Sequence, residues 1–359
     1  MLKIGIIGGG IAGSATAYYL SKTKSEVTIF EKDFVAAHSS GKSNGSIIPL
    51  IEKDKNTSIS LLSDYALNIH NKLMQKFSDI YYVKKPVMHL FTKNENSAIY
   101  ENYLNSENHN NSHLLSLSEL RHIDARVSDN VSGGLFIKNS LEVDSLMLTK
   151  SLLNYSVENG ANFVNENVKR INTNSKDKLI IHTHEGIYNF DKIIIANGPW
   201  ANQLIKDISG KDLITPIKGQ ILRMKNIFPG FKISFWWGKN YITTKDKNIS
   251  WLGTTHENIG YDEKPTPNAK KIILDNAKEI FPFLDERFIV EQTACLRPMT
   301  KDSLPIIGRI SNNENIFICG GGSANGILFG PAMGKTIYKY IFNEELDNYI
   351  YDFSVDRFL

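Results

Sequence analysis

KIGIIGGGIAG (residues 3–13) is the stretch that decides the fold of this chain. Residues 3–7 form a short apolar run with β-branched side chains, which is typical of a buried strand. Residues 14–22 then carry small and apolar side chains at helical spacing, and EVTIF (26–30) predicts a second strand that ends at Glu31. A strand, a glycine-rich turn, a helix and a second strand in this order indicate a dinucleotide-binding unit.

The three glycines of the turn each have a physical reason. Gly8 permits a tight turn, Gly10 lets the backbone approach a pyrophosphate, and Gly13 lets helix and strand pack closely. The start of the helix offers unpaired N–H groups and a partial positive charge to the phosphates. Glu31 is placed to accept hydrogen bonds from the adenosine ribose, which disfavours the 2′-phosphate of NADP. At this point both FAD and NAD remain open.

The bulk composition excludes several classes of protein. The chain has 359 residues with 41 basic and 38 acidic side chains, and a net charge of +3 does not indicate nucleic-acid binding. Two cysteines, Cys295 and Cys319, form neither a disulfide scaffold nor a metal cluster. The N-terminus lacks the pattern of a signal peptide, and no apolar run approaches the ~20 residues that span a bilayer. We therefore expect a cytoplasmic protein with no metal site and no membrane span.

The later segments extend the fold. NIFICGGGSANGILFGPAMGKTIYKYIF (315–342) repeats the order strand, glycine turn and helix, so both ends of the chain should contribute to one sheet. The β-type segments 86–93, 220–225 and 240–257 predict a mainly antiparallel substrate domain. We expect an α/β fold, α+β overall, with a Rossmann-like doubly wound domain and an interleaved β domain. The expected boundaries are 1–80, 144–215 and 296–359 for the first domain, and 81–143 and 216–295 for the second.

Over essentially its whole length the chain resembles the D-amino-acid oxidase-type FAD-dependent oxidoreductases. The resemblance is strongest to glycine oxidase, in LRPMTKDSLPIIGR (296–309) and GGGSANGILFGPAMG (320–334). It implies an oxidase or dehydrogenase with non-covalent FAD. The implied reaction oxidises a C–N bond of a small amino acid or N-substituted glycine, by hydride transfer to flavin N5. The electron acceptor would be O2 or another oxidant.

Two residues are candidates for substrate contact. The resemblance implies that Arg297 binds the substrate carboxylate, and a guanidinium can do so with two parallel hydrogen bonds. The alternative is a structural salt bridge to Asp302. Tyr241 is similar to a family tyrosine that contacts the same carboxylate, and its alternative is a core aromatic. Trp236 and Trp237 are adjacent, and either a wall of the active site or a place in the hydrophobic core would suit them.

The cofactor residues follow from the dinucleotide motif and from the resemblance. Backbone N–H groups at Gly326 and Ile327 would face the N1/C2 oxygen edge of the flavin, and 39–49 would pass along the ring and ribityl chain. The predicted cofactor-binding residues are Gly8, Gly10, Ile11, Ala12, Gly13, Glu31, Lys32, Ser39, Ser40, Gly41, Asn44, Gly45, Val168, Asn197, Gly198, Trp200, Gly322, Asn325, Gly326 and Ile327.

Three positions depart from the family patterns. Ala324 stands where glycine oxidase has a second arginine, and Trp251 stands where sarcosine oxidases have a lysine that promotes reaction with oxygen. Cys295 stands where sarcosine-oxidase relatives attach flavin covalently, although the surrounding LRPMTKD follows the non-covalent pattern. These positions leave open which residues besides Arg297 bind the substrate carboxylate and whether oxygen is the electron acceptor.

Two other functions stay open. SGKSNGSIIPLI (40–51) is similar to the FAD-dependent half of the enzyme that matures wobble-uridine side chains, which would make the carboxymethylaminomethyl group of tRNA the substrate. The modest charge offers little binding to phosphates, so a small amine or amino acid is favoured over tRNA. The remaining alternative is a flavin-binding protein without catalysis.

Overall fold

A six-stranded sheet forms one half of the molecule, in the order β19-β20-β13-β1-β2-β9. The computed structural model describes residues 1–51, 57–92, 101, 104, 112–173, 178–245, 248–310 and 313–358. The four pairs from β20 to β9 are parallel, and β19 joins β20 antiparallel. The strands are β1 (Lys3–Ile7), β2 (Glu26–Phe30), β9 (Asn162–Val164), β13 (Lys192–Ile195), β19 (Ile306–Ile310) and β20 (Asn313–Gly320).

Different layers cover the two faces of this sheet, and strand alternation sorts the side chains between them. Ile4 and Ile6 pack in a core with four helices: α1 (Ile11–Leu20), α3 (Ser58–Lys76), α6 (Ser145–Glu158) and α9 (Gly326–Ile341). Ile7 and Ile193 pack in a core with α7 (Asn202–Ser209) and a three-stranded antiparallel sheet of β10 (Arg170–Thr173), β11 (Leu179–His182) and β12 (Ile187–Phe190). These apolar runs are buried on both sides, as parallel strands require.

An eight-stranded sheet forms the other half of the molecule, in the order β18-β14-β17-β16-β15-β5-β7-β6. Its pairs are antiparallel except β15 with β5. Helix α8 (Pro267–Ile280) covers one face. The strands are β5 (Val87–Thr92), β6 (Ser112–Ser116), β7 (Val131–Ile137), β14 (Thr215–Met224), β15 (Ser234–Trp237), β16 (Asn240–Thr244), β17 (Ser250–Gly253) and β18 (Ile289–Met299).

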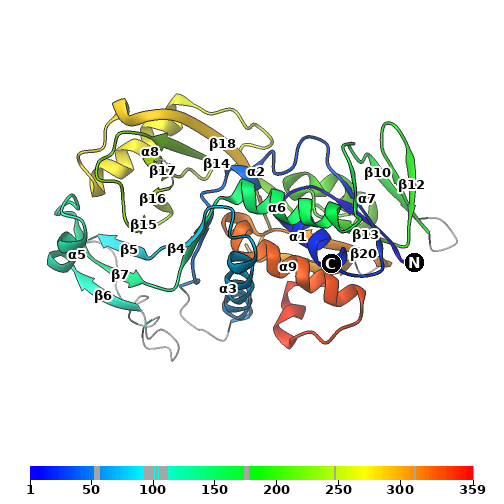
Figure 1. Ribbon diagram of the computed structural model, residues 1–359. Helices are drawn as coiled ribbons and strands as arrows, with labels where there is room; N and C mark the ends of the chain where they lie inside the picture. The colour runs from blue at the N-terminus through cyan, green and yellow to red at the C-terminus, as the bar shows by residue number, and fades with distance from the viewer. Residues whose placement is uncertain are drawn as a thin grey trace.

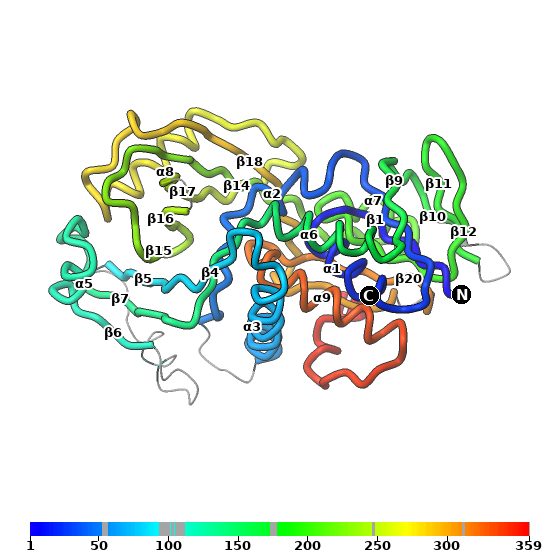
Figure 2. The backbone as a smooth tube through the Cα atoms, in the orientation of Figure 1, coloured from blue at the N-terminus to red at the C-terminus, as the bar shows by residue number. Residues whose placement is uncertain are grey.

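The chain passes repeatedly between the two halves. In Figure 1 the eight-stranded sheet and α8 lie on the left, and α1, α6 and α9 lie on the right. Figure 2 shows early blue, middle green and late orange segments together on the right, with cyan and yellow segments on the left. A short sheet joins the halves, made of β3 (Ser46–Ile47), β4 (Tyr82–Lys84) and β8 (Leu141–Val143). Two further helices are α2 (Ser39–Lys42) and α5 (Leu117–Ile123).

The predicted α/β class, with a doubly wound sheet and an interleaved antiparallel sheet, is confirmed. The structure differs from the prediction in detail. The segment after α6 forms two strands, β9 and β10, which belong to different sheets. Strand β18 continues to Met299, so it crosses the boundary predicted between 295 and 296. In the described part of the chain, no helix is long and apolar enough to cross a membrane.

Candidate active site

A cavity of 650 Å³ lies where the two halves meet. Its walls are the turns after β1, β2 and β13 of the six-stranded sheet and the face of the eight-stranded sheet that α8 leaves uncovered. Ligand pockets have volumes of ~300–1,000 Å³ and favour the carboxyl ends of parallel strands. This cavity fits both descriptions.

Strand alternation decides which side chains reach the cavity. On β15, Phe235 and Trp237 pack into the core beneath α8, whereas Trp236 between them lines the cavity. Of the two roles expected from the sequence, Trp237 therefore has the place in the hydrophobic core, and Trp236 forms part of the cavity wall. The same period of two on β18 brings three side chains to the cavity: Thr293, Cys295 and Arg297.

Arg297 is held in place by polar contacts that leave its charge uncompensated. Its Nη1 donates to the carbonyl oxygen of Thr255 at 3.0 Å, and its Nη2 donates to Oγ1 of Thr254 at 2.6 Å. Among the described residues no carboxylate lies within 4.0 Å of the guanidinium. The partner considered from sequence, Asp302, instead pairs with Arg357, whose Nε donates to Oδ2 at 2.7 Å. The alternative prediction, a structural salt bridge between Arg297 and Asp302, is therefore wrong.

Gly219 makes the space that the Arg297 guanidinium occupies. On β14 it lies opposite Cys295 of β18, and Ile217 lies opposite Arg297. A Cβ at Gly219 would sit 2.3 Å from Nη2 and 2.4 Å from Cζ of Arg297, so any side chain there would displace the guanidinium from this position. The role of Gly219 depends on the pairing of β14 with β18, which the sequence does not reveal.

Tyr241 lies on β16 beside Arg297 at the same end of the cavity. It is 5% exposed, and its ring stacks on Trp236 at 4.9 Å between centroids. Gly253 leaves room for this ring, since a Cβ there would lie 2.6 Å from Cε1. Burial raises the pKa of the Tyr241 hydroxyl above its usual 10, and Arg297 only partly opposes this. The hydroxyl therefore stays protonated and can donate a hydrogen bond.

The glycine turn after β1 has the geometry expected for dinucleotide binding. Gly8 has φ of +112°, and a Cβ there would lie 2.5 Å from the Ala196 carbonyl oxygen. Gly13 packs against the Gly8 carbonyl oxygen so closely that a Cβ would lie 1.9 Å away. Glu31 is buried at the end of β2, and its Oε2 accepts from the Gly9 N–H at 2.7 Å. Helix α1 begins beside the cavity, and the N–H of its first residue, Ile11, donates to Oγ of Ser40 at 3.0 Å.

Most of the predicted cofactor residues line the cavity. The residues that do so are Gly8, Gly10, Ile11, Ala12, Glu31, Lys32, Ser39, Ser40, Asn44, Val168, Asn197, Gly198, Trp200, Gly322, Gly326 and Ile327. Gly13, Gly41, Gly45 and Asn325 are outside its lining. The first three of these are packing positions, because a Cβ would meet backbone oxygen atoms at 1.9, 2.3 and 1.9 Å, respectively.

Two buried acceptor atoms of the cavity wall have no hydrogen-bond partner among the described residues. They are Oδ1 of Asn197 and Oε2 of Glu166. Asn197 follows β13 and was predicted. Glu166 was missed, because it follows β9, and only the pairing of β9 with β2 brings it near Glu31. Buried acceptors without donors are costly, so these two atoms indicate that a ligand donates to them.

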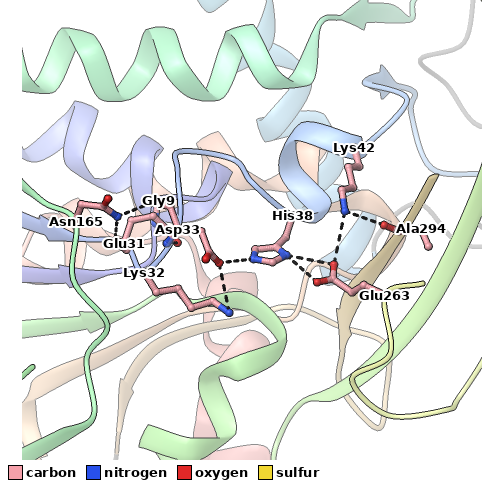
Figure 3. A network of polar contacts seen from close by, with 9 residues as sticks. All are labelled: Gly9, Glu31, Lys32, Asp33, His38, Lys42, Asn165, Glu263 and Ala294. Atoms are coloured by element: carbon pink, nitrogen blue, oxygen red, sulfur yellow. Dashed lines mark hydrogen bonds and ion pairs between the residues drawn. The ribbon is translucent and has the colours of Figure 1, made fainter. Parts of the chain in front are cut away.

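A polar network runs along the rim of the cavity (Figure 3). His38 lies between two carboxylates, with Nε2 2.8 Å from Asp33 and Nδ1 2.9 Å from Glu263. Lys42 donates to the Ala294 carbonyl oxygen at 3.0 Å and lies 4.0 Å from Glu263. The network connects the segment that begins after β2 with the eight-stranded half. His38 and Lys42 line the cavity and were not among the predicted residues.

A family model described as FAD dependent oxidoreductase matches residues 3–339. The chain belongs to this family. Glycine oxidase from Bacillus subtilis is 23% identical over 98% of this chain and 96% of its own length. The crystal structure of glycine oxidase from Geobacillus kaustophilus superposes with a TM-score of 0.91 at 22% identity, covering 99% of each chain. L-proline dehydrogenase from P. horikoshii gives 0.89 at 21% identity, covering 99% and 97%.

The residues of the cavity fit the FAD that this family uses. The tight Gly8 turn, the start of α1 at the cavity wall and the unpartnered acceptors of Asn197 and Glu166 form a cradle for a dinucleotide. The protein is thus an FAD-dependent oxidoreductase. Cys295, which also lines the cavity, is a free thiol whose pKa is raised by burial, while Arg297 partly lowers it. Trp251 is outside the cavity lining, where Arg223 and Lys245 pack against its ring.

Proposed function

We propose that this protein oxidises the C–N bond of a small amino acid or N-substituted glycine. The observation that carries the proposal is Arg297, a cation that lines the cavity with no carboxylate of the described chain within 4.0 Å. Two of its five N–H groups are held by Thr254 and Thr255, so the guanidinium keeps its orientation while the others can bind a substrate carboxylate. The glycine oxidase relatives support an amino-acid substrate.

The roles of the residues follow from this placement. Arg297 orients the substrate through its carboxylate, and Tyr241 donates a second hydrogen bond to the same group. Trp236 stacks on Tyr241 and restricts water at this end. When bound, FAD would supply the two-electron oxidant that takes a hydride from the carbon bearing the nitrogen, and water would then hydrolyse the imine to a carbonyl compound and ammonia or an amine. The predicted cofactor residues along the cavity hold FAD in this proposal.

In this proposal, the two halves of the molecule have different functions. Residues 1–80, 144–215 and 296–359 bind FAD, apart from the end of β18, which carries Arg297 to the substrate side formed by residues 81–143 and 216–295. Cysteine 295 stays unlinked to the flavin, because a thiol with a raised pKa is a poor nucleophile.

The test is anaerobic bleaching of the flavin by a panel of compounds. The panel contains glycine, D- and L-amino acids, N-alkyl glycines, simple amines without a carboxylate, and tRNA with a carboxymethylaminomethyl uridine. Amino acids or N-alkyl glycines should reduce the flavin rapidly, and simple amines should not. Reduction of the flavin by the modified tRNA alone would overturn the proposal. Comparing the rate at which the reduced flavin is reoxidised by air with its rate of reoxidation by a dye would identify the electron acceptor.

A further inference from the structure

The two sides of the cavity differ in their charged residues. On the six-stranded side, the carboxylates Glu31 and Glu166 follow the neighbouring strands β2 and β9, and Lys32 lines the cavity with them. On the eight-stranded side, the titratable residues lining the cavity beside Arg297 are Lys239, His256, Tyr241 and Cys295, and Lys239 is the second cation there. No carboxylate stands among the lining residues there. A site walled by one sign of charge attracts ligands of the opposite sign.

Two hydrogen bonds link the residue that follows Lys239 to Arg297. Lys239 occupies the turn between β15 and β16, and its neighbour Asn240 accepts from the Thr254 N–H through Oδ1 at 3.3 Å. Thr254 in turn accepts from Nη2 of Arg297. The Lys239 side chain is exposed at the cavity, and among the described residues no carboxylate lies within 4.0 Å of it. Its charge is therefore available to a ligand.

His256 completes the group from the other side. It directly follows Thr255, whose carbonyl oxygen accepts from Nη1 of Arg297. Partial burial lowers the pKa of His256, and the charges of Lys239 and Arg297 lower it further. The imidazole is therefore neutral near pH 7, where it can still donate a hydrogen bond to a ligand.

We propose that Lys239 and His256 form a second anion subsite, so that the substrate is an amino acid with two carboxylates, one bound by Arg297 and the other by Lys239. This inference rests on the proposed function, since it needs Arg297 to bind the first carboxylate. N-carboxyalkyl amino acids have the required chemistry, because their oxidisable nitrogen lies between the two acidic groups. Glycine itself would reach Arg297 and leave Lys239 without a partner.

The first test measures binding without turnover. Oxydiacetate and methoxyacetate are ethers that lack an oxidisable amine and differ by one carboxylate, and both can be titrated against the FAD-loaded protein through the flavin absorption spectrum. Oxydiacetate should bind about 5–20-fold more tightly than methoxyacetate. Lys239→Met should abolish this difference, Lys239→Arg should retain it, and His256→Gln should reduce it. The matched control is Lys232→Met, an exposed lysine outside the cavity lining, which should leave both affinities unchanged.

The second test uses oxidisable substrates. Iminodiacetate and N-(2-carboxyethyl)glycine should show a lower KM than N-methylglycine and N-propylglycine, and Lys239→Met should raise the KM of the first pair only. Equal binding of both ethers, or an equal effect of Lys239→Met on all four substrates, would overturn the second subsite while Arg297 keeps its role. Lack of binding by either ether, with no reduction of the flavin by any of the four amines or by the free amino acids of the panel, would overturn the proposed function as well.

Discussion

Arg297 combines a fixed position with an unpaired charge, which makes it the most informative residue to change. Because Thr254 and Thr255 orient the guanidinium, its removal should affect the substrate carboxylate more than the fold. A charge-assisted hydrogen bond contributes ~1.5–3 kcal/mol, and each 1.4 kcal/mol is tenfold in rate. We expect Arg297→Met to lower kcat/KM for carboxylate substrates by roughly 10–1,000-fold, with FAD retained.

Two further variants sharpen this prediction in steady-state kinetics. Arg297→Lys should recover only part of the loss, since an ammonium cannot form two parallel hydrogen bonds. Arg223→Met is the matched control: Arg223 lies on β14, pairs with Glu291 at 2.7 Å and is outside the cavity lining. Normal turnover of a carboxylate substrate by Arg297→Met would assign Arg297 a purely structural role.

Gly219 provides an independent test of the same site. Adding one methyl group in Gly219→Ala would force the Arg297 guanidinium away, because the new Cβ would lie 2.3 Å from Nη2. We expect a loss of kcat/KM of roughly 10–100-fold, expressed mainly as a raised KM. FAD absorbance and the melting temperature should change little. If Gly219→Ala keeps its KM, the packing of Arg297 against this glycine is not what positions the guanidinium.

At the scale of elements, the connection from β17 to α8 couples the two halves of the molecule. Three consecutive side chains in it contact the rest of the chain: the Tyr261 hydroxyl donates to the Pro199 carbonyl oxygen at 3.1 Å, Asp262 accepts from Lys218 at 2.9 Å, and Glu263 pairs with His38. Lys218 is fully buried, so its amine depends on Asp262 for compensation. Through Tyr261 and Glu263, this connection joins the eight-stranded half to segments that follow β13 and β2 of the six-stranded half.

The contact of His38 with Glu263 should depend on pH. Partial burial alone would lower the pKa of His38, but Glu263 and Asp33 raise it above 6.5. The stabilisation is therefore fully present below about pH 6.5 and is lost as the pH rises through the higher pKa of the folded state. Against wild type, His38→Gln should lower Tm by roughly 1–3 °C at pH 6 and by less at pH 9.

Thermal denaturation at both pH values checks this, and His122→Gln, an exposed histidine on α5, is the control. The pKa values of Asp33 and Glu263 are lowered, mainly by His38 against the opposing effect of burial, so the carboxylates remain charged at pH 6. A Tm difference that grows toward pH 9 would contradict the assignment of His38 as the titrating group.

At the scale of the whole molecule, the proposed FAD site is the cavity to which both halves contribute, so FAD binding should stabilise both halves. At a free concentration of 1,000 Kd the linkage contributes about 4 kcal/mol, or roughly 5 °C in Tm for a chain of this size. Removing FAD should lower Tm by that amount, and adding it back should restore it. The same Tm with and without cofactor would mean that FAD binding does not contribute measurably to the stability of the two halves.

Denaturation also tests the linkage of the cofactor. Because burial raises the pKa of Cys295, we expect acid precipitation to release all the flavin into solution, and Cys295→Ser to retain the yellow colour of the native protein. Absorbance of the supernatant measures this. Colour that stays with the precipitate in the wild type and is absent from Cys295→Ser would indicate a thioether.

The sequence by itself determined the features that depend on neighbours along the chain. The turn with Gly8, Gly10 and Gly13 between a strand and a helix, the acid at Glu31 and the alternation of apolar residues are local patterns, because steric limits and side-chain periodicity act over a few residues. These local patterns were sufficient to predict the α/β class and the dinucleotide-binding unit. The LRPMTKD stretch also singled out Arg297, which lines the cavity.

Only the tertiary structure decided what depends on the pairing of distant segments. The register of β14 with β18 gives Gly219 its place beside Arg297, and the face that α8 covers decides that Trp236, and not Trp237, reaches the cavity. The pairing of His38 with Glu263, 225 residues apart, belongs to the same class. Strand order and register are set by packing between elements, since each strand has two faces and its own sequence does not specify which neighbour covers either of them.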